Sequence, residues 1–475
     1  MGVGAASEAA RGRGQAPPLP GSIAALFLFV SFAAQAATPD QVAAIDRIFA
    51  EAYPSGGPGA AVLVVQDGKN VLRKGYGMAE VELGVPISPD MVFRVGSVTK
   101  EFTSACVLRL AEEGRLSLDD PIGKYLPDFP TGGRRVTIEE LLNHTSGIHS
   151  YTDMPAWHER MREDWTLTEL EAFFRDAPFD FEPGTKWHYD NSGYVLLGAI
   201  LEKVTGRPYA EIVDEMIFRP LGMSASRYGS DRPIIPGRVA GYQRTPGGVV
   251  NAPFLSMTQP YAAGALVSTV DDLACWQAAL DAGRVLKPET LRRMWTPARL
   301  PGGSDTRYGY GWIVWSWDGH AVVEHGGGIN GFQSANMRLP DDHIYAAVLS
   351  NCGGCADPRT LALRAATTLV GKPYDARAAA PIAPERLNRF AGTYRDSDGD
   401  DWVVTREDDH LVVAAGPRSW RAWPASDTEF FFRDAVRTIR FVANPDGRIV
   451  GMDVDEFAGP VETATRIEPL PPRRP

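Results

Sequence analysis

The amino-acid sequence predicts an α+β fold followed by a small all-β domain. A β-hairpin pattern comes early, helical patterns fill the middle, and alternating strand patterns return after residue 308. We expect the late strands to join the early hairpin, so that one sheet is made from both ends of the larger domain. Beyond residue 385 only short strand patterns occur.

The elements expected in the larger domain follow from apolar spacing and turn residues. Asp67 and Gly68 mark the hairpin turn. Gly114 and Gly206 are expected to end helices, and Ser268 or Thr269 to begin one. In order, the elements are a helix within 38–53, a hairpin over 59–80, helices over 97–113, 192–205 and near 268–280, and strands within 308–327 and 331–351.

A linker-like stretch rich in Ala and Pro separates this domain from the last ninety residues. There the strand patterns are separated by turn signals, which predicts an up-and-down barrel. The expected division is a signal peptide at 1–36, a first domain at 37–371, a linker at 372–384 and an all-β domain at 385–475.

The first 36 residues have the features of an export signal. Arg11 and Arg13 precede the apolar run SIAALFLFVSFAA, and Ala34 and Ala36 fit a small-x-small cleavage site. Cleavage after residue 36 or 37 is expected, which predicts a periplasmic or secreted protein. An uncleaved membrane anchor is the alternative. No other long apolar segment exists, so no membrane span is expected after cleavage.

Composition excludes several functions. The chain has 475 residues, 44% hydrophobic and 23% charged, as in soluble globular proteins. Its net charge is −11 and it has no long basic run, so a nucleic-acid partner is not expected. With eight histidines and no HExxH pattern, a zinc hydrolase is disfavoured. No metal or organic cofactor is implied.

The four cysteines give one further expectation. Cys106 lies on an apolar helical face and is expected in the core. Cys352 and Cys355 form a CxxC pattern, which fits either a small disulfide in an oxidising compartment or a redox pair.

Ser97 and Lys100 stand three residues apart, at the start of the predicted helix 97–113. Positions i and i+3 share a helix face, so Lys100 can reach the serine hydroxyl and activate it as a base. The free N–H groups of a first helical turn also favour developing negative charge. This is the only S-x-x-K in the chain, yet serine is also a common helix cap.

A second candidate lies just before the helix 192–205. Tyr189 and Asn191 form the only Y-x-N of the chain. The pKa of a free tyrosine is about 10, and a cation about 4 Å away, such as Lys100, supplies roughly the energy that would bring it near 7. The alternative is a core tyrosine beside a surface asparagine.

The third candidate is a glycine-rich strand end. His325 precedes three glycines, which permit close approach of a substrate backbone to a strand edge. The backbone N–H of Gly328 can then pair with that of Ser97 as an oxyanion hole. The alternative is a glycine-rich hairpin with a surface histidine.

Together the three motifs resemble the serine β-lactamase and penicillin-binding protein superfamily, in its class C-like branch. That branch also holds esterases, D-aminopeptidases and D,D-peptidases. The order S-x-x-K, Y-x-N, then K- or H-x-G matches, as do FRVGSVTKEFT, LLNHTSGI, FEPGTKWHYDNSGY, PYAAGALVSTVDDLACW and YGYGW, over roughly residues 40 to 370. The resemblance implies a β-lactamase/transpeptidase-like antiparallel sheet flanked by helices, with an all-helical insert. The all-β domain resembles accessory domains of some members more weakly.

The resemblance also implies catalytic roles. Ser97 attacks a carbonyl to form an acyl-enzyme, while Lys100 and Tyr189 share proton transfer. Asn191 hydrogen-bonds the substrate amide or orients Lys100. His144 is expected to belong to the scaffold near the cleft.

On the substrate side, the resemblance places His325, Gly327 and Gly328 along the cleft. Many members have a lysine where this chain has His325, and no Lys-Thr-Gly or Lys-Ser-Gly occurs. A histidine is only partly charged near neutral pH and would hold a substrate carboxylate less firmly. An esterase, amidase or aminopeptidase-like hydrolase is therefore favoured over a β-lactamase or D,D-carboxypeptidase.

The expected substrate is a small ester, amide or peptide, with water as the second substrate. Two readings of another class stay open: a non-catalytic penicillin-binding or sensor protein, and a scaffold protein. The sequence leaves the oligomeric state open.

Overall fold

The computed structural model describes residues 36–467 except 398 and 417. The predicted signal peptide, except Ala36, lies outside the described residues, as do the last eight residues of the predicted all-β domain. No helix in the described part of the chain combines the length and the apolar character needed to cross a membrane.

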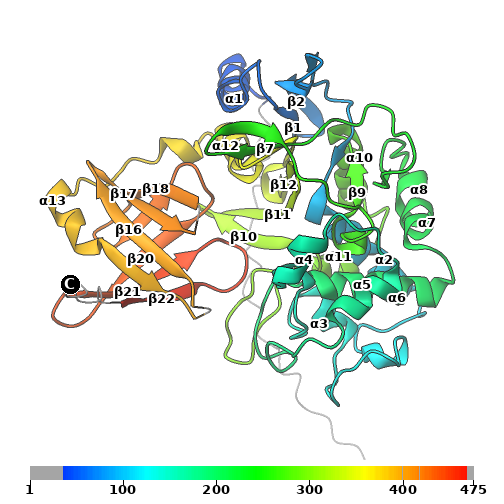
Figure 1. The fold of residues 1–475 in the computed structure, drawn as a ribbon. Coiled ribbons are helices and arrows are strands. Elements are labelled where there is room, and N and C mark those ends of the chain that lie inside the picture. Colours follow the sequence, from blue (N-terminus) through cyan, green and yellow to red (C-terminus); the bar gives the residue numbers. More distant parts are fainter. Residues whose placement is uncertain (1–35, 398, 417, 468–475) are drawn as a thin grey trace, which may run out of the picture. The chain divides into compact units, whose positions relative to one another are not determined.

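The central element is a six-stranded antiparallel sheet built from residues 60–76 and 313–350, the two ends of the larger domain, as the sequence predicts (Figure 1). The Asp67–Gly68 turn connects its first hairpin, and both residues have positive φ. The strand order is β10-β11-β12-β13-β1-β2, with β1 Ala60–Gln66, β2 Lys69–Tyr76, β10 Ile313–Trp317, β11 His320–Ile329, β12 Phe332–Leu339 and β13 Ile344–Ser350.

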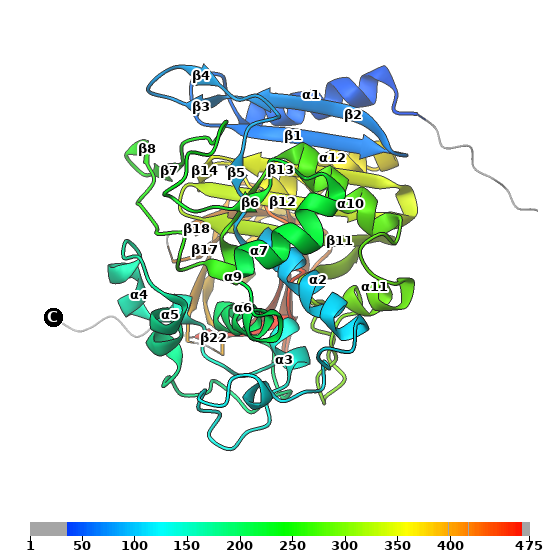
Figure 2. The same ribbon diagram turned by 90° about the vertical axis from the view of Figure 1, so that its right-hand side faces the viewer.

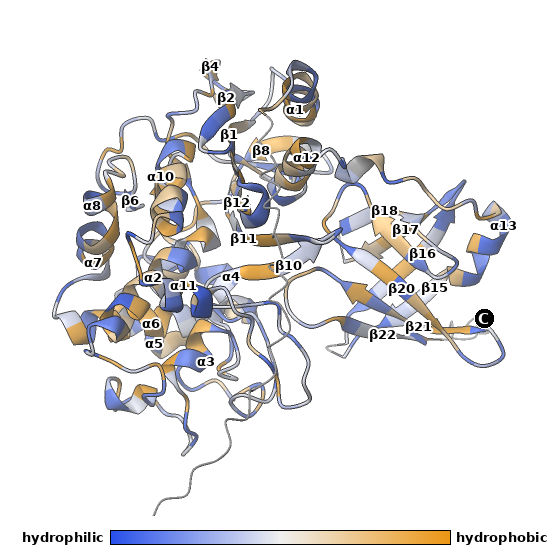
Figure 3. Cartoon of the chain, turned by 180° about the vertical axis from the view of Figure 1, so that it is seen from behind, coloured by the Kyte–Doolittle hydropathy of each residue, from blue (hydrophilic) through white to orange (hydrophobic). Residues whose placement is uncertain are grey.

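Helices cover both faces of this sheet. α1 (Pro39–Ala52) and α12 (Pro358–Val370) pack on one face. α2 (Thr99–Glu112) and α10 (Val270–Asp281) pack on the other. In Figure 1, α1 and α12 lie to the left of the strands and α2 and α10 to the right, and Figure 2, viewed from that right-hand side, has α2 and α10 in front of the strands. In Figure 3 the hydrophobic residues, drawn in orange, gather on β10 and β11 and on parts of these helices. The sheet strand β13 is buried along its whole length because both faces are covered.

The segment between α2 and α10 consists of helices joined by long loops. α6 (Asn191–Thr205) is its longest helix, and it ends at Gly206 in the left-handed conformation, as predicted. The other helices of this part are α3 Ile138–Leu142, α4 Pro155–Arg160, α5 Leu167–Phe174, α7 Tyr209–Val213, α8 Arg219–Leu221 and α9 Tyr261–Gly264. α11 (Pro288–Met294) follows α10, whose N-cap is Thr269.

The insert is not all-helical as expected, because short strands interrupt it. Within the insert these strands are β6 Arg227–Tyr228, β7 Tyr242–Thr245, β8 Gly248–Asn251 and β9 Leu266–Ser268. β7 and β8 form a local hairpin, which β14 (Cys352–Gly353) extends, whereas β9 pairs with β6 and with β5 (Phe93–Arg94). β3 (Met78–Glu80) and β4 (Val85–Pro86) form a separate pair before α2.

After the short helix α13 (Pro384–Leu387), eight strands form a closed antiparallel barrel in sequence order. The prediction of an up-and-down barrel is confirmed. Apolar side chains that include Tyr394, Leu411 and Phe441 fill its core. The strands are β15 Gly392–Arg395, β16 Asp401–Glu407, β17 His410–Ala415, β18 Arg418–Pro424, β19 Glu429–Phe432, β20 Thr438–Ala443, β21 Ile449–Asp455 and β22 Glu462–Ile467.

Cys352 and Cys355 form a disulfide, which was one of the two alternatives, and Cys106 is buried as predicted. Replacing both disulfide cysteines by serine should lower the free energy of unfolding by about 2 kcal/mol, because the bond closes a very short loop. Urea denaturation of the variant and the oxidised wild type measures this. A loss well above that value would show that the bond does more than restrict the unfolded chain.

Candidate active site

Ser97 lies in a short 3-10 turn, η1 (Gly96–Val98), which leads directly into α2. The predicted helix over 97–113 therefore begins two residues later than expected as an α-helix. The tighter turn still keeps Ser97 and Lys100 on one side. The Lys100 ammonium nitrogen lies 3.3 Å from the Ser97 hydroxyl oxygen, and Ser97 stays partly exposed. The pair therefore has an accessible hydroxyl beside a buried amine.

Lys100 is fully buried, and neutral oxygens surround its amine. It donates to the Asn191 side-chain oxygen at 2.8 Å and to the Ala263 carbonyl at 3.0 Å. Burial lowers the pKa of Lys100 well below its ordinary value, and the charge of Asp190 offsets part of this effect. A lysine held in this way loses its proton more readily than a solvated lysine, as a general base must.

Tyr189 lies beside this pair. The Lys100 ammonium nitrogen is 4.7 Å from the centre of its ring. The expectation that Lys100 lowers the pKa of Tyr189 is wrong: burial raises this pKa, and the nearby Ser97 hydroxyl offsets it only in part. The cost of removing a phenolate from water exceeds the attraction of one cation. The buried Tyr189 hydroxyl has no hydrogen-bond partner among the described residues, so it is free to bond a bound substrate.

Asn191 links the second motif to the first. Its side-chain oxygen accepts from Lys100, and its amide nitrogen donates to the Thr152 hydroxyl at 3.0 Å. Of the two roles considered for it, this geometry matches the orientation of Lys100. Because Asn191 is the first residue of α6, the rigid helix fixes its place.

His325 lies on β11 but does not face solvent as a partly charged group. It is 3% exposed, and burial lowers its pKa to about 3. One ring nitrogen lies 2.6 Å from the Gly326 carbonyl and the other 2.8 Å from the Tyr308 hydroxyl. The neutral ring therefore donates to Gly326 and accepts from Tyr308. The expectation of a partly charged histidine at the cleft is wrong, because the site removes it from water.

The glycines after His325 let β11 approach the serine turn. A Cβ atom on Gly327 would lie 2.0 Å from the Val95 carbonyl oxygen, and one on Gly96 would lie 3.0 Å from the Gly328 nitrogen. β10 pairs with β11 only as far as Glu324, so the strand edge beyond it is not covered by β10. This edge, next to Ser97, is where an extended substrate can pair.

Asp190, between the two residues of the Y-x-N motif, was not predicted as a site residue. It is 2% exposed at the N-terminus of α6. Burial raises the pKa of Asp190 to about 7. Hydrogen bonds from backbone N–H groups of α6 and from the Ser146 hydroxyl favour the charged form and oppose this rise. The only signal in the sequence was a carboxylate just before a predicted helix.

Glu101 was also missed, although it fixes the direction of α2. This fully buried carboxyl accepts from the Asn336 amide of β12 at 2.7 and 2.9 Å and from the Trp276 indole of α10 at 2.9 Å. It therefore ties α2 to the sheet and to α10. A pattern of single residues does not show which buried partners a carboxyl will meet.

His144 belongs to the scaffold, as expected. It is buried, accepts from the Asp190 backbone N–H at 3.1 Å, and its ring centre lies 4.5 Å from that of Tyr189.

In the described part of the chain, no group of three or more His, Cys, Asp or Glu side chains is placed to hold a metal ion.

Comparison with known proteins identifies the family. Residues 45–369 match the family model described as Beta-lactamase, and residues 376–469 match a domain of unknown function, DUF3471. The chain is 28% identical over 419 residues to Penicillin-binding protein 4* of Bacillus subtilis, covering 81% of this chain and 90% of that protein.

Two further similarities are to proteins of the same kind. The D-aminopeptidase of Gluconobacter oxydans is 28% identical over 333 residues, which are 67% of this chain and 60% of that enzyme. The octameric penicillin-binding protein homologue from Pyrococcus abyssi superimposes with a TM-score of 0.64 at 28% identity, covering 90% of this chain and 99% of that one. The chain belongs to the beta-lactamase family and is a serine hydrolase of that fold.

Proposed function

We propose that this protein cleaves an ester or amide bond of a small substrate through an acyl-enzyme on Ser97, with Lys100 as the base. The observation that carries the proposal is the buried Lys100 amine, 3.3 Å from the Ser97 hydroxyl and surrounded by neutral oxygens. Such an amine is kept from being a permanent cation and lies within reach of the proton that it must remove.

The proton transfers follow from this arrangement. The Ser97 oxygen attacks the substrate carbonyl carbon as its proton passes to Lys100. The N–H groups of Ser97 and Gly328 bind the resulting oxyanion. The leaving group then departs with that proton, which reaches it from Lys100 through the neutral Tyr189 hydroxyl. Water hydrolyses the acyl-enzyme by the reverse sequence, which releases the acid and restores Ser97.

The substrate class follows from the third motif. His325 is buried and neutral, so it supplies no fixed charge for a substrate carboxylate. This favours an ester or amide without a carboxylate over a penicillin or a peptide ending in a free carboxylate. The similarity to a D-aminopeptidase supports substrates with a D-amino-acid acyl group. Export of the protein is part of the proposal, and the Cys352–Cys355 disulfide supports an oxidising compartment.

Intact mass after incubation with a fluorophosphonate tests the proposed nucleophile. We expect one adduct on the wild type and none on Ser97→Ala, with Ser104→Ala, which alters another serine of the same region, as the labelled control. Turnover of p-nitrophenyl butyrate and D-alanine p-nitroanilide should exceed that of penicillin. An unlabelled wild type without turnover would favour the non-catalytic reading, and penicillin hydrolysis as fast as the best ester would overturn the substrate class.

A further inference from the structure

The loop between β21 and β22 of the barrel lies against the residues that support the catalytic site. We call Asp455, the last residue of β21, together with the next four residues, up to Gly459, the docking loop. Asp455 pairs with the Arg307 guanidinium, and the Glu456 carbonyl accepts from Arg359 at 2.9 Å. Both arginines come from the part of the chain before the barrel, so the docking loop makes polar contacts with that part.

The apolar contacts of the docking loop are equally direct. The Phe457 ring stacks on Trp315 of β10 with ring centres 4.6 Å apart. Gly459 lies so close to the Trp187 ring that a Cβ atom there would come within 2.4 Å of it. Trp187, Tyr189, Phe457 and Ala458 all pack against one buried cluster.

Each partner of the docking loop is a close neighbour of an active-site residue. Arg307 precedes Tyr308, whose hydroxyl donates to His325. Trp187 stands two residues before Tyr189, and its ring centre is 6.1 Å from that of His144. The docking loop therefore contacts residues beside two of the three motifs: Trp187 near the Y-x-N motif, and Arg307, next to the Tyr308 that bonds His325.

The third link is a buried ion pair. Arg359 donates to the Glu324 carboxylate at 2.7 Å, and Trp315 donates to the same oxygen at 2.7 Å. Glu324 is fully buried and directly precedes His325 on β11. Because Arg359 also binds the docking loop, it joins the loop to the strand that lines the site.

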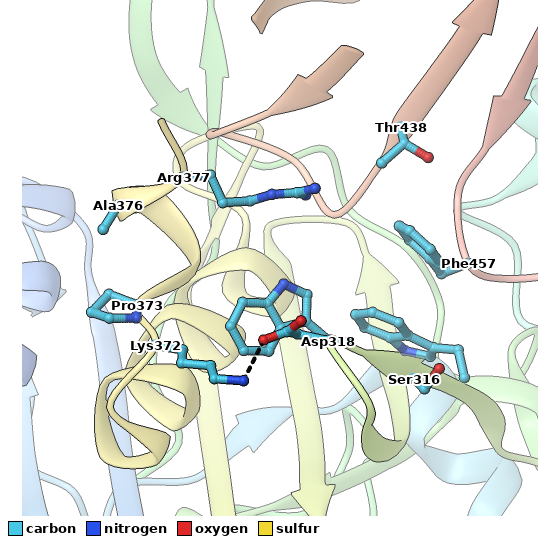
Figure 4. Close-up of a pocket in the computed structure, with 10 residues that line it drawn as sticks. Ser316, Asp318, Lys372, Pro373, Ala376, Arg377, Thr438 and Phe457 are labelled. Carbon is cyan, nitrogen blue, oxygen red and sulfur yellow. Dashed lines mark hydrogen bonds and ion pairs between the residues drawn. The ribbon is translucent and has the colours of Figure 1, made fainter. Parts of the chain in front are cut away.

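Packing beside the loop is incomplete. A pocket of about 520 Å³ lies between the end of β10, the residues that follow α12, and the barrel. Phe457 is among its lining residues (Figure 4). Figure 4 also shows the ion pair between Lys372 and Asp318 on the far side of this pocket. On this side the docking loop is therefore held by the specific contacts above rather than by continuous packing.

We propose that the docking loop is a positioning element of the active site: it holds Trp187 and, through it, Tyr189 in the place that acylation requires. The inference rests on the proposed function. It makes the barrel a working part of the hydrolase, although none of the barrel's described residues hydrogen-bonds to Ser97 or Lys100.

Substitution of one glycine tests this, because the barrel offers a matched control. Gly459 and Gly447 have φ of +81° and +79°, but a Cβ atom at Gly447 would meet nothing within 4 Å. Both alanine variants carry the same backbone strain, and only Gly459→Ala pushes on Trp187. We expect Gly459→Ala to be labelled by the fluorophosphonate at least tenfold more slowly than Gly447→Ala, at a temperature where circular dichroism shows both folded.

A second substitution separates displacement of Trp187 from a general loss of structure. Trp187→Phe shortens the ring that the new methyl group meets, so the double variant Gly459→Ala/Trp187→Phe should be labelled faster than Gly459→Ala alone. If Gly459→Ala does not fold, Phe457→Leu, which removes the stack on Trp315, is expected to show the slower labelling instead.

Equal labelling rates for Gly459→Ala and Gly447→Ala, or for the wild type and Phe457→Leu where that variant replaces it, would overturn the inference while the wild type still reacts. A wild type that does not react at all would overturn the proposed function instead. The two failures are therefore distinguishable.

Discussion

Lys100→Met is expected to lower the rate of Ser97 acylation by about 10³-fold or more, which is within the range for loss of a base that activates a nucleophile. Methionine has a similar length and fills the same buried space, but it cannot accept the serine proton. The fold should survive, because the substitution removes an amine that is costly to bury. The two groups that lose a hydrogen-bond donor, the Asn191 side-chain oxygen and the Ala263 carbonyl, are neutral. Fluorophosphonate labelling rates and thermal unfolding measure both effects.

Two controls sharpen this prediction. Lys100→Arg keeps a donor to Asn191 but stays protonated, so it should be as inactive as the methionine variant. Lys69→Met alters an exposed lysine of β2 and should leave the rate unchanged. A Lys100→Met enzyme that kept more than a tenth of the wild-type rate would show that another group takes the serine proton.

Much of the fold was predictable because it depends on local pattern. The alternation around Asp67–Gly68 and the apolar spacing before Gly206 describe elements whose ends are fixed by turn residues. The barrel was predictable for the same reason. The short strands of the insert were missed because each has only two to four residues, and because β6 and β9 pair across a long stretch of sequence.

The composition of the site was predictable, but its electrostatics were not. The S-x-x-K spacing brings Ser97 and Lys100 together in the 3-10 turn as it would in an α-helix, because both geometries place i and i+3 nearby. The state of Tyr189 depends on burial by residues far away in the sequence, such as His144 and Tyr308, and His325 in turn lies against Tyr189. Burial reverses the sign expected from charge alone for Tyr189.

The Asp190→Asn variant should change the pH dependence of both stability and activity. In the folded protein the pKa of Asp190 is raised from 3.8 to about 7. Between these values the folded chain holds a proton that the unfolded chain has lost, so this group makes the wild type less stable as the pH rises from about 4 to about 7. Asparagine does not ionise and keeps an oxygen for the N–H groups of α6.

The stability difference between Asp190→Asn and the wild type should therefore grow in favour of the variant across this window. Three pKa units set an upper bound of about 4 kcal/mol above pH 7. Chemical denaturation at pH 4.5, 6 and 8 measures the trend. A difference that stays constant with pH would mean that Asp190 is ionised in the folded protein throughout.

Activity should shift in a direction that follows from the same charge. Above about pH 7, where Asp190 is ionised, its charge raises the pKa of Lys100, so its removal should lower that pKa further. Acylation needs the neutral amine, and the rate therefore rises with pH through the pKa of Lys100. The acid limb of the kcat/KM profile should move to lower pH in Asp190→Asn, with Asp176→Asn, an exposed carboxylate, as the unshifted control. A shift to higher pH would show that Asp190 acts on another group, because loss of a negative charge beside an amine cannot make that amine more basic.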